Sequence, residues 1–538
     1  MSEPVLLSVV VPVYNQAESI LDNVDTILER VQAGLGEAFE LIVVSDGSVD
    51  RTEEQLLERR DELVRVLHYD RNLGKGYALK VGGLQARGRW IGYVDGDLDL
   101  DPASIPRFLR HAEQRSLDIV IGSKRHPDSV VHYPRSRRVA SWLYQQLVHA
   151  LFRLDVRDTQ VGLKVFRHEV ADQVLPLLLV KRFAFDLELL AVSRSLGFSR
   201  IEEQPIDLRY RFTGSGVGSL AVLRALVDTA AIFYRLRILR YYERKREALG
   251  GLGGSRARSY APLVTVLAAP GVSVASLDYA RIELADPSVG VRLAVEHAEG
   301  ELVAIVGAGA VLAGNWLSAT VPFLARPEVA AVVTPRLAPS TGGARVRAAA
   351  AVQESRLGGG SLHYRFTPGN LRVVRDYPSD SILVRRKAYL ELGADVPVHE
   401  LAEHLSGRGG TVVYTPETVL VSPVPPLVLP HLRRMAVYGR RRGRELRRRG
   451  LRAARPSTVL VPALAAVVLS APLVALGRLP GRLLVGAAIL YGGAIGSSAL
   501  IATLRFRSPG VGLLALLAFP LTHAVYAFAF VQGAVTRR

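Results

Sequence analysis

Three aspartates stand at alternate positions directly after a short apolar run. Asp95, Asp97 and Asp99 follow Trp90-Ile-Gly-Tyr-Val94, which has the composition of a buried strand. Alternate side chains of an extended chain share a face, so these carboxylates can point to one place. Mg²⁺ in nucleotide enzymes is usually held by one or two carboxylates together with substrate phosphates. The stretch therefore predicts a site for Mg²⁺ or Mn²⁺, although aspartates are also common in turns and helix caps.

The elements before this stretch alternate between apolar strands and helical segments. Strands are predicted at 6–13, 40–44 and 64–68, and helices at 18–33, at 52–60 and from the end of the loop 71–76 to about 86. This alternation predicts an α/β domain with a parallel sheet and helices on both faces. Ligands of such sheets bind at the carboxyl ends of the strands. The polar residues predicted at those ends are Tyr14, Asn15, Asp46, Asn72, Lys75, Asp95 and Asp97.

Several motifs resemble those of family 2 glycosyltransferases with the GT-A (Rossmann-like) fold. Four of them are Pro12-Val-Tyr-Asn15, Ser45-Asp-Gly-Ser48, Asn72-Leu-Gly-Lys-Gly76 and Asp95-Gly-Asp97. Three more are similar to the branch of dolichyl-phosphate glucosyltransferases and polyprenyl-phosphate mannose synthases: Gly122-Ser-Lys-Arg-His126, Asp158-Thr-Gln-Val-Gly-Leu-Lys-Val-Phe166 and Arg182-Phe-Ala-Phe-Asp-Leu-Glu188. The resemblance covers about residues 6–240. The family usually has two aspartates before Gly-Ser, where this chain has Ser45-Asp46, which puts its base and ribose contacts in question.

The resemblance implies metal-dependent, inverting transfer of a hexose from UDP-glucose or GDP-mannose to polyprenyl phosphate. Asp95, Asp97 and Asp99 would hold the cation, which offsets charge on the diphosphate leaving group. Lys75 would act beside the carboxylates in catalysis, and the nucleotide would be bound by Pro12, Tyr14, Asn15, Asp46, Asp95 and Asp97. A lipid phosphate is already ionised, so the acceptor side needs cationic docking rather than a general base. The residues expected there are Lys124, Arg125, Arg135, Arg137, Arg138, Asp158 and Gln160.

Residues 260–430 contain an imperfect internal repeat of this domain. Ala86–Asp97 can be laid on Ala298–Gly309, and the interval from Gly88 to Asp95 equals that from Gly300 to Gly307. Gly307 and Gly309 stand where the metal carboxylates should be and cannot ligate through side chains. The repeat predicts a second GT-A-like domain without metal-dependent activity. It could bind a glycan, pair with the first domain or brace it.

The 538-residue chain has a net charge of +18, 49% hydrophobic residues and no cysteine, which excludes disulfide and thiolate chemistry. An arginine run at 433–455 precedes apolar segments at 459–476, 483–504 and 511–535. This juxtaposition favours an anionic membrane surface over nucleic acid. A helix at 220–242 is predicted to lie at the membrane interface. Three spans would place Arg537 and Arg538 outside the cell, which conflicts with the positive-inside trend.

These patterns predict a multi-pass protein of the cell membrane with its catalytic domains in the cytoplasm, since no signal peptide is apparent. The predicted domains are a catalytic domain at 1–245, a linker at 246–259, a GT-A-like domain at 260–431, a basic segment at 432–456 and a membrane region at 457–538. Homo-oligomer formation is left open. Two other hypotheses are a glycosyltransferase acting on a cell-envelope glycan or glycolipid gripped by the second domain, and a membrane scaffold without activity. No Gln-x-x-Arg-Trp stretch is present, which argues against a processive polysaccharide synthase.

Overall fold

A computed structural model describes residues 5–36, 38–59, 61–69, 71–131, 135–182, 184–208, 219–250, 252, 260–269, 272, 277–285, 288, 290–339, 342–450 and 481–536. The chain divides into two compact units. Unit 1 comprises Met1–Ala308, Leu312–Thr334 and Asn370–Val419, and unit 2 comprises Gly309–Val311, Pro335–Gly369 and Leu420–Arg538. Both predicted α/β domains therefore contribute their sheets to unit 1, and the segment 335–369 belongs with the C-terminal helices instead.

The first sheet of unit 1 confirms the predicted α/β class. Its strands, in sheet order, are β3 (Val64–Tyr69), β2 (Phe39–Asp46), β1 (Leu7–Val13), β4 (Trp90–Tyr93), β7 (Lys164–Arg167), β5 (Ile119–Ser123) and β8 (Ile201–Pro205). The first four are parallel, and β7 runs antiparallel between β4 and β5. β1 and β2 are buried along most of their length, as their runs of β-branched residues predict.

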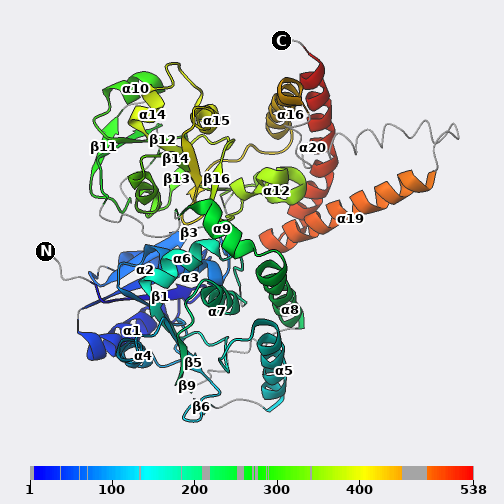
Figure 1. Ribbon diagram of the computed structural model, residues 1–538. Coiled ribbons are helices and arrows are strands. Elements are labelled where there is room, and N and C mark those ends of the chain that lie inside the picture. Colours follow the sequence, from blue (N-terminus) through cyan, green and yellow to red (C-terminus); the bar gives the residue numbers. More distant parts are fainter. Residues whose placement is uncertain are drawn as a thin grey trace. The chain divides into compact units, whose positions relative to one another are not determined.

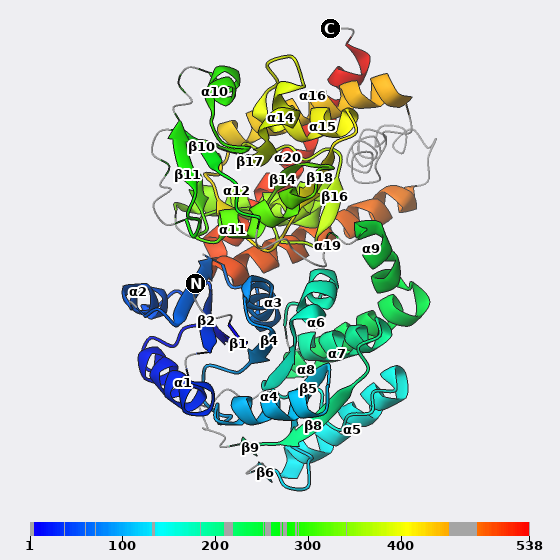
Figure 2. The ribbon, with the colours of Figure 1, turned by 60° about the vertical axis from the view of Figure 1, so that its left-hand side comes forward.

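Helices cover both faces of this sheet (Figures 1 and 2). Val9 and Val11 of β1 share an apolar core with α1 (Ile20–Leu35) and α4 (Ser104–Gln114). Val10 points to the other face, where Gly82 of α3 (Lys75–Gln85) lies so close that a Cβ at this glycine would strike the Val10 side chain. The remaining helices of this region include α2 (Thr52–Glu58), α6 (His168–Val174) and α7 (Phe185–Ser195).

The second sheet repeats this strand pattern. Its order is β11 (Ile282–Ala285), β10 (Val264–Ala268), β12 (Leu302–Val306), β17 (Ile382–Arg385), β14 (Val329–Val333), β18 (Thr411–Tyr414) and β16 (Arg372–Val374). β10, β11 and β12 are parallel, and β17 runs antiparallel between β12 and β14, as β7 does between β4 and β5. Its helices include α10 (Val291–His297), α11 (Trp316–Thr320), α14 (Arg386–Leu390) and α15 (Leu401–Gly407).

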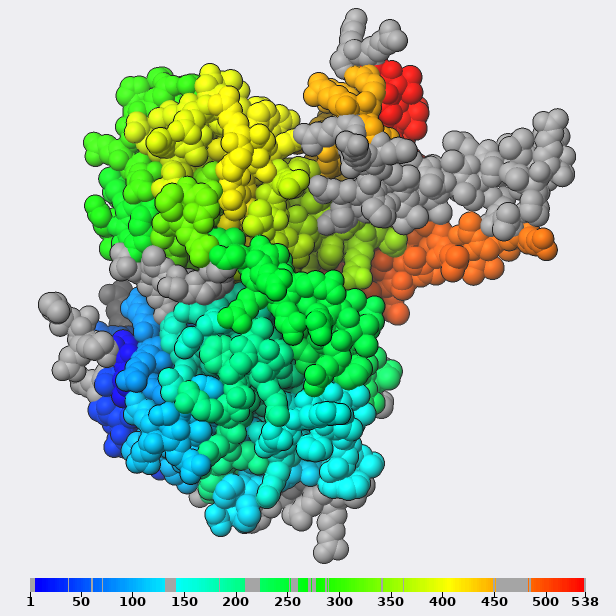
Figure 3. Space-filling view, viewed as in Figure 1, coloured from blue at the N-terminus to red at the C-terminus, as the bar shows by residue number. Residues whose placement is uncertain are grey.

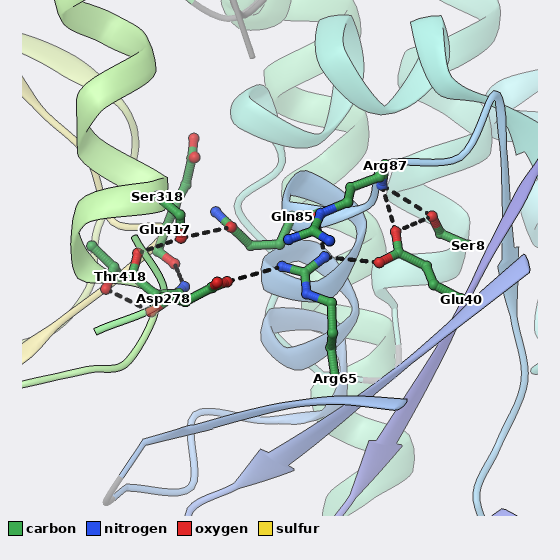
Figure 4. Close-up of polar contacts among 10 residues, drawn as sticks. Ser8, Glu40, Arg65, Gln85, Arg87, Asp278, Ser318, Glu417 and Thr418 are labelled. Atoms are coloured by element: carbon green, nitrogen blue, oxygen red, sulfur yellow. Dashed lines mark hydrogen bonds and ion pairs between the residues drawn. The ribbon is translucent and has the colours of Figure 1, made fainter. Parts of the chain in front are cut away.

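One buried polar network occurs in both sheets. In the first, Ser8 Oγ donates to Glu40 Oε1 at 2.6 Å and accepts the Gly88 N–H at 2.7 Å (Ser8 and Glu40 are drawn in Figure 4). In the second, Thr265 donates its hydroxyl to Glu283 and accepts the Gly300 N–H at 2.9 Å. Gly88 and Gly300 are the two glycines that the sequence alignment paired. The shared network and strand order support the predicted GT-A-like repeat.

The helix predicted at 220–242 is interrupted. It consists of α8 (Ser219–Phe233), a π-helical turn at Tyr234–Ile238 and α9 (Tyr241–Leu249), with Arg240 in the left-handed region between the last two. α8 packs against α5 (Arg135–Phe152), and both helices lie on the face shown in Figure 3. Their exposed apolar side chains are Trp142, Leu143, Leu147, Leu223, Leu226 and Val227. An apolar face of this kind fits the predicted interfacial position, which stays a prediction.

Unit 2 consists mainly of helices, beside the short paired strands β15 (Arg336–Leu337) and β19 (Leu420–Val421). Its helices include α12 (Ala344–Glu354), α13 (Arg356–Gly359), α16 (Leu429–Arg449), α19 (Gly481–Phe506) and α20 (Pro509–Val535). Among the described residues, Val485–Phe506 and Pro509–Val535 are long and apolar enough to cross a membrane. They match the predicted segments at 483–504 and 511–535, whereas the segment at 459–476 and the arginines from 451 to 455 lie outside the described residues.

Candidate functional site

The predicted catalytic cluster assembles at the carboxyl end of β4 and the start of α3. Lys75 is the first residue of α3, and its Nζ lies 2.5 Å from Asp95 Oδ1. Asp97 accepts the main-chain N–H of Asp99 at 3.2 Å. The structure therefore brings Lys75, Asp95 and Asp97 together across more than twenty residues of sequence. Their functional roles stay predictions.

The electrostatics of this cluster suit a bound cation. Loss of hydration and the negative charges of Asp95 and Asp99 raise the pKa of Asp97 to about 6. Burial opposes the charged form of Lys75, but Asp95, Asp186 and Asp97 outweigh it and raise the pKa of Lys75 to about 12. A divalent cation would reverse the repulsion that disfavours the Asp97 carboxylate.

Fewer carboxylates lie close enough together to bind a metal ion than the three that the sequence predicted. No group of three or more His, Cys, Asp or Glu side chains is close enough to hold a metal ion within the described residues. Asp99 is thus not gathered with Asp95 and Asp97 into a three-carboxylate cage. The oxygen donors of Asp95 and Asp97 still fit Mg²⁺ or Mn²⁺ in the common arrangement where substrate phosphates complete the shell.

Gly162 makes room for the Asp95 carboxylate. It precedes β7, the strand beside β4, and a Cβ at this glycine would fall on the Asp95 carboxylate. The second sheet has the reverse arrangement, because Gly307 follows β12 and lies against Asp380, just before β17. Glycine and aspartate have exchanged strands. In the second domain, atoms of Asp380 thus take the space beside Gly307.

Asp46, predicted to bind the nucleotide, holds the neighbouring loop in this structure. Its carboxylate is buried and accepts hydrogen bonds from Tyr69 Oη at 2.9 Å, the Leu73 N–H at 2.7 Å and the Gly74 N–H at 2.9 Å. Burial raises the pKa of Asp46 to about 6, although these three donors oppose the shift. Asp46 thereby ties the end of β2 to the residues that lead into α3 and Lys75.

The other predicted nucleotide residues lie at the neighbouring strand end. Pro12 is paired with Val44 in the sheet, and the Tyr14 side chain is 40% exposed. Asn15 has a φ of 52°, donates its N–H to Ser48 Oγ at 3.2 Å and accepts the Val49 N–H through Oδ1 at 2.9 Å. The loops after β1 and β2 are therefore joined, and they leave the Tyr14 ring open to solvent.

The structure describes the side chains of four of the seven predicted acceptor residues: Lys124, Arg125, Asp158 and Gln160. Asp158 is buried and accepts the Lys124 N–H at 3.3 Å and the Gln160 N–H at 3.1 Å, with Lys124 Nζ at 3.7 Å. The side-chain nitrogen of Gln160 is buried without a hydrogen-bond partner in the described structure. The Arg125 N–H is bonded to Ser123 Oγ at 3.3 Å. The remaining members begin α5, where their side chains lie outside the described residues: Arg135, Arg137 and Arg138.

Two acids of the downstream motif were not predicted as site residues. Asp186 Oδ1 lies 2.7 Å from Lys164 Nζ, whose side chain is only 1% exposed. Glu188 is fully buried and accepts the Leu179 and Val180 N–H groups and the Tyr242 hydroxyl, at 2.8, 2.7 and 2.5 Å. The motif Arg182–Glu188 signalled both acids, but Lys164 and Tyr242 lie 22 and 54 residues away, so spacing within the motif could not reveal these contacts.

Comparison with known proteins places this site in a family. The model for "Glycosyl transferase family 2" matches residues 8–175. Dodecaprenyl-phosphate galacturonate synthase of Rhizobium johnstonii is 30% identical over 254 residues, covering 46% of this chain and 71% of that protein. The chain belongs to glycosyl transferase family 2. Its first sheet, with α1 to α7, is the GT-A-type domain of a family 2 enzyme.

Other family 2 proteins are similar over shorter shares of their length. Glycosyltransferase AglD of Haloferax volcanii is 35% identical over 37% of this chain and 32% of its own. Dolichyl-phosphate beta-glucosyltransferase of Drosophila melanogaster is 37% identical over 35% of this chain and 63% of its own. A solved glucosyl-3-phosphoglycerate synthase from Mycobacterium tuberculosis is 18% identical, with a TM-score of 0.33 over 42% of this chain and 80% of its own. This family 2 chain thus spans less than two thirds of AglD and of the Drosophila enzyme.

Proposed function

We propose that this family 2 protein transfers a hexose from a nucleotide-sugar to polyprenyl phosphate. The observation that carries the proposal is the cluster of Asp95, Asp97 and Lys75 at the carboxyl end of the first sheet. The buried side-chain nitrogen of Gln160, which lacks a protein partner in the described structure, supports an acceptor phosphate beside the segment that precedes β7. Similar proteins are named for polyprenyl- or dolichyl-phosphate acceptors, which supports the same acceptor class.

In this mechanism the protein positions charge rather than moving protons. The glycosidic bond between the sugar C1 and the diphosphate oxygen breaks, and a bond forms between C1 and an acceptor phosphate oxygen. Bound Mg²⁺ or Mn²⁺ supplies positive charge against the departing diphosphate. Asp95 and Asp97 would hold that ion, and Lys75, whose pKa is about 12, adds a permanent positive charge beside it. A phosphate monoester is largely ionised at neutral pH, so attack requires no general base.

The test uses the full-length protein in detergent with Mn²⁺. UDP-glucose and GDP-mannose are supplied separately, each with and without a polyprenyl phosphate, and lipid products are detected by mass spectrometry. We expect a hexosyl-phosphoryl-polyprenol from one donor, and no product without the lipid phosphate. Nucleotide-sugar binding without a lipid product would contradict the proposal and favour a glycan or glycolipid acceptor.

We further infer that the protein is attached to a membrane through α19 and the first half of α20, with α16 and the C-terminus on the same side. His431 in α16 is hydrogen-bonded to Thr522 in α20 at 3.0 Å, and Arg447 near the end of α16 donates to the Thr536 carbonyl. The two helices therefore run in parallel along the second half of α20. Gly443 is so close to α20 that a Cβ would strike the Phe530 carbonyl oxygen. This arrangement differs from three spans, which would separate the two ends.

Because the chain has no cysteine, single-cysteine labelling can test this arrangement. Arg448→Cys and Thr536→Cys place one thiol at the exposed end of each helix. With a membrane-impermeant maleimide, we expect both to react in vesicles of one orientation and both to be protected in the other. Reaction of the two variants from opposite sides would contradict the parallel arrangement, and Ser508→Cys, between α19 and α20, reports whether α20 crosses.

A further inference from the structure

Helix α3 is covered on both sides within unit 1. Every residue from Gly76 to Gln85 is buried, so the helix has no solvent-facing stripe. Its inner side rests on Val10 and Val44 of the first sheet. On the other side Tyr77 and Val81 line a small gap together with residues of the second domain: Ala313, Asn315, Glu417, Thr418 and Val419. The second domain therefore completes the burial of the helix that begins with Lys75.

A hydrogen bond joins the first turn of α3 to the second domain. Tyr77 is 3% exposed and donates its hydroxyl to the Pro416 carbonyl oxygen at 2.5 Å. Pro416 follows β18, the strand that ends at Tyr414. The acceptor is a main-chain carbonyl, which every residue type carries. Among the side chains, only the Tyr77 hydroxyl is therefore needed for this hydrogen bond.

From Tyr77 the contacts continue to the catalytic cluster. The Tyr77 ring packs edge-on against Tyr69, with centroids 5.4 Å apart, and Tyr69 donates its hydroxyl to Asp46. Asp46 in turn accepts the N–H groups of Leu73 and Gly74, directly before Lys75. The path from Pro416 to the residue paired with Asp95 is thus made of buried contacts with fixed partners.

The far end of α3 is also tied to the second domain, as Figure 4 shows. Ser318 donates its hydroxyl to Gln85 Oε1 at 3.4 Å, and Arg65 lies 3.5 Å from Asp278. Arg65 also donates to the Gln85 carbonyl at 3.1 Å. These outer contacts are longer than the Tyr77 bond and partly exposed, so they contribute less to the position of the helix.

We propose that the second domain is a positioning element for the first, and that Tyr77 is the positioning residue through which it acts. By holding the first turn of α3, the Tyr77–Pro416 bond keeps the loop 71–74 and Lys75 in register with Asp95. The Tyr77–Pro416 hydrogen bond is present whichever substrate the protein uses. The expected effect of this bond on nucleotide binding rests on the proposed function. Of the three roles open to the repeat, bracing is the one that these contacts favour.

The test compares two tyrosine-to-phenylalanine variants of the full-length protein. Tyr77→Phe keeps the ring packing and removes only the hydroxyl. Tyr377→Phe is the matched control, because Tyr377 is also buried and donates its hydroxyl at 2.8 Å to a main-chain carbonyl, that of Thr334, inside the second domain. Hydrogen–deuterium exchange is followed in peptides covering residues 71–80, and binding of UDP and of GDP is titrated in the presence of Mn²⁺.

We expect Tyr77→Phe to speed exchange at the Leu73 and Gly74 amides by about tenfold, since local opening is controlled by such contacts. Nucleotide affinity should fall several-fold in the same variant, and Tyr377→Phe should change neither quantity. Unchanged exchange in Tyr77→Phe, or equal changes in both variants, would overturn the proposal. If neither nucleotide binds the unsubstituted protein, the proposed function fails. The hydrogen–deuterium exchange of the two variants still decides whether Tyr77 positions the loop 71–74.

Discussion

Asp97→Asn is expected to lower the rate of hexose transfer by at least about 100- to 1,000-fold, the size of effect seen when one preorganised electrostatic group is removed. The change keeps the shape of the side chain and removes one of the two carboxylates available to a cation. Thermal stability should change little, because the Asp97 side chain is exposed and an asparagine oxygen can still accept the Asp99 N–H. Product formation and thermal unfolding with and without Mn²⁺ measure the two effects.

The pH dependence of Mn²⁺ binding provides an independent check on Asp97. Its pKa is raised from 3.8 to about 6 in the folded protein. Between these values the folded state binds more protons than the unfolded state, so this group favours folding more as the pH falls. Cation binding requires the ionised form, and we expect the Mn²⁺ affinity to decrease below pH 6. Asp97→Asn should remove this dependence.

Asp101→Asn is the matched control for both measurements. Asp101 lies on the same loop, and its carboxylate accepts the Ala103 N–H at 3.0 Å rather than facing the cluster. An asparagine Oδ1 can still accept this N–H, so the control should keep both its stability and its activity. Activity within a few-fold of normal in Asp97→Asn would show that the reaction does not depend on this carboxylate.

Local sequence patterns predicted the framework of the site well. The β-branched run at 6–13 became β1 (Leu7–Val13), and the acids predicted at the end of the fourth strand lie at the carboxyl end of β4. The glycines at 88 and 300 identified the repeat, because each follows a helix where a main-chain N–H meets a buried hydroxyl. These features depend on the periodicity of apolar residues and on the spacing of residues that are close in sequence, and both can be read from the sequence itself.

Contacts between distant segments could not be predicted in the same way. Gly162, just before β7, makes room for Asp95, which comes 67 residues earlier in the chain, as the two residue numbers show. The residues next to this glycine in sequence do not indicate that contact. The donors that surround Asp46 are likewise fixed only once β2 and β3 are paired. The run at 220–242 has the apolar spacing of one helix, but Arg240 breaks it, and Tyr242 turns inward to reach Glu188.

Loss of the buried Lys164–Asp186 ion pair should have the largest effect on stability. Asp186→Ala leaves the Lys164 ammonium, 1% exposed, beside the Val161 carbonyl oxygen but without its carboxylate. Breaking a buried pair in this way typically costs about 3–5 kcal/mol, because the remaining charge is neither hydrated nor neutralised. The lowest-temperature unfolding transition of the protein, followed by calorimetry, is expected to move down by many degrees.

Two further variants distinguish a buried charge from lost packing. Lys164→Met combined with Asp186→Leu removes both charges and should recover much of the stability, since an apolar pair of similar volume is often as stable as a buried ion pair. Asp155→Asn breaks the exposed pair with Arg194 and should cost less than about 1 kcal/mol. If the double variant is as unstable as Asp186→Ala, the cost lies in packing around α7 rather than in the unpaired ammonium. Recovery of stability without recovery of transfer would show that Asp186 also acts on Lys75, whose pKa it helps to raise.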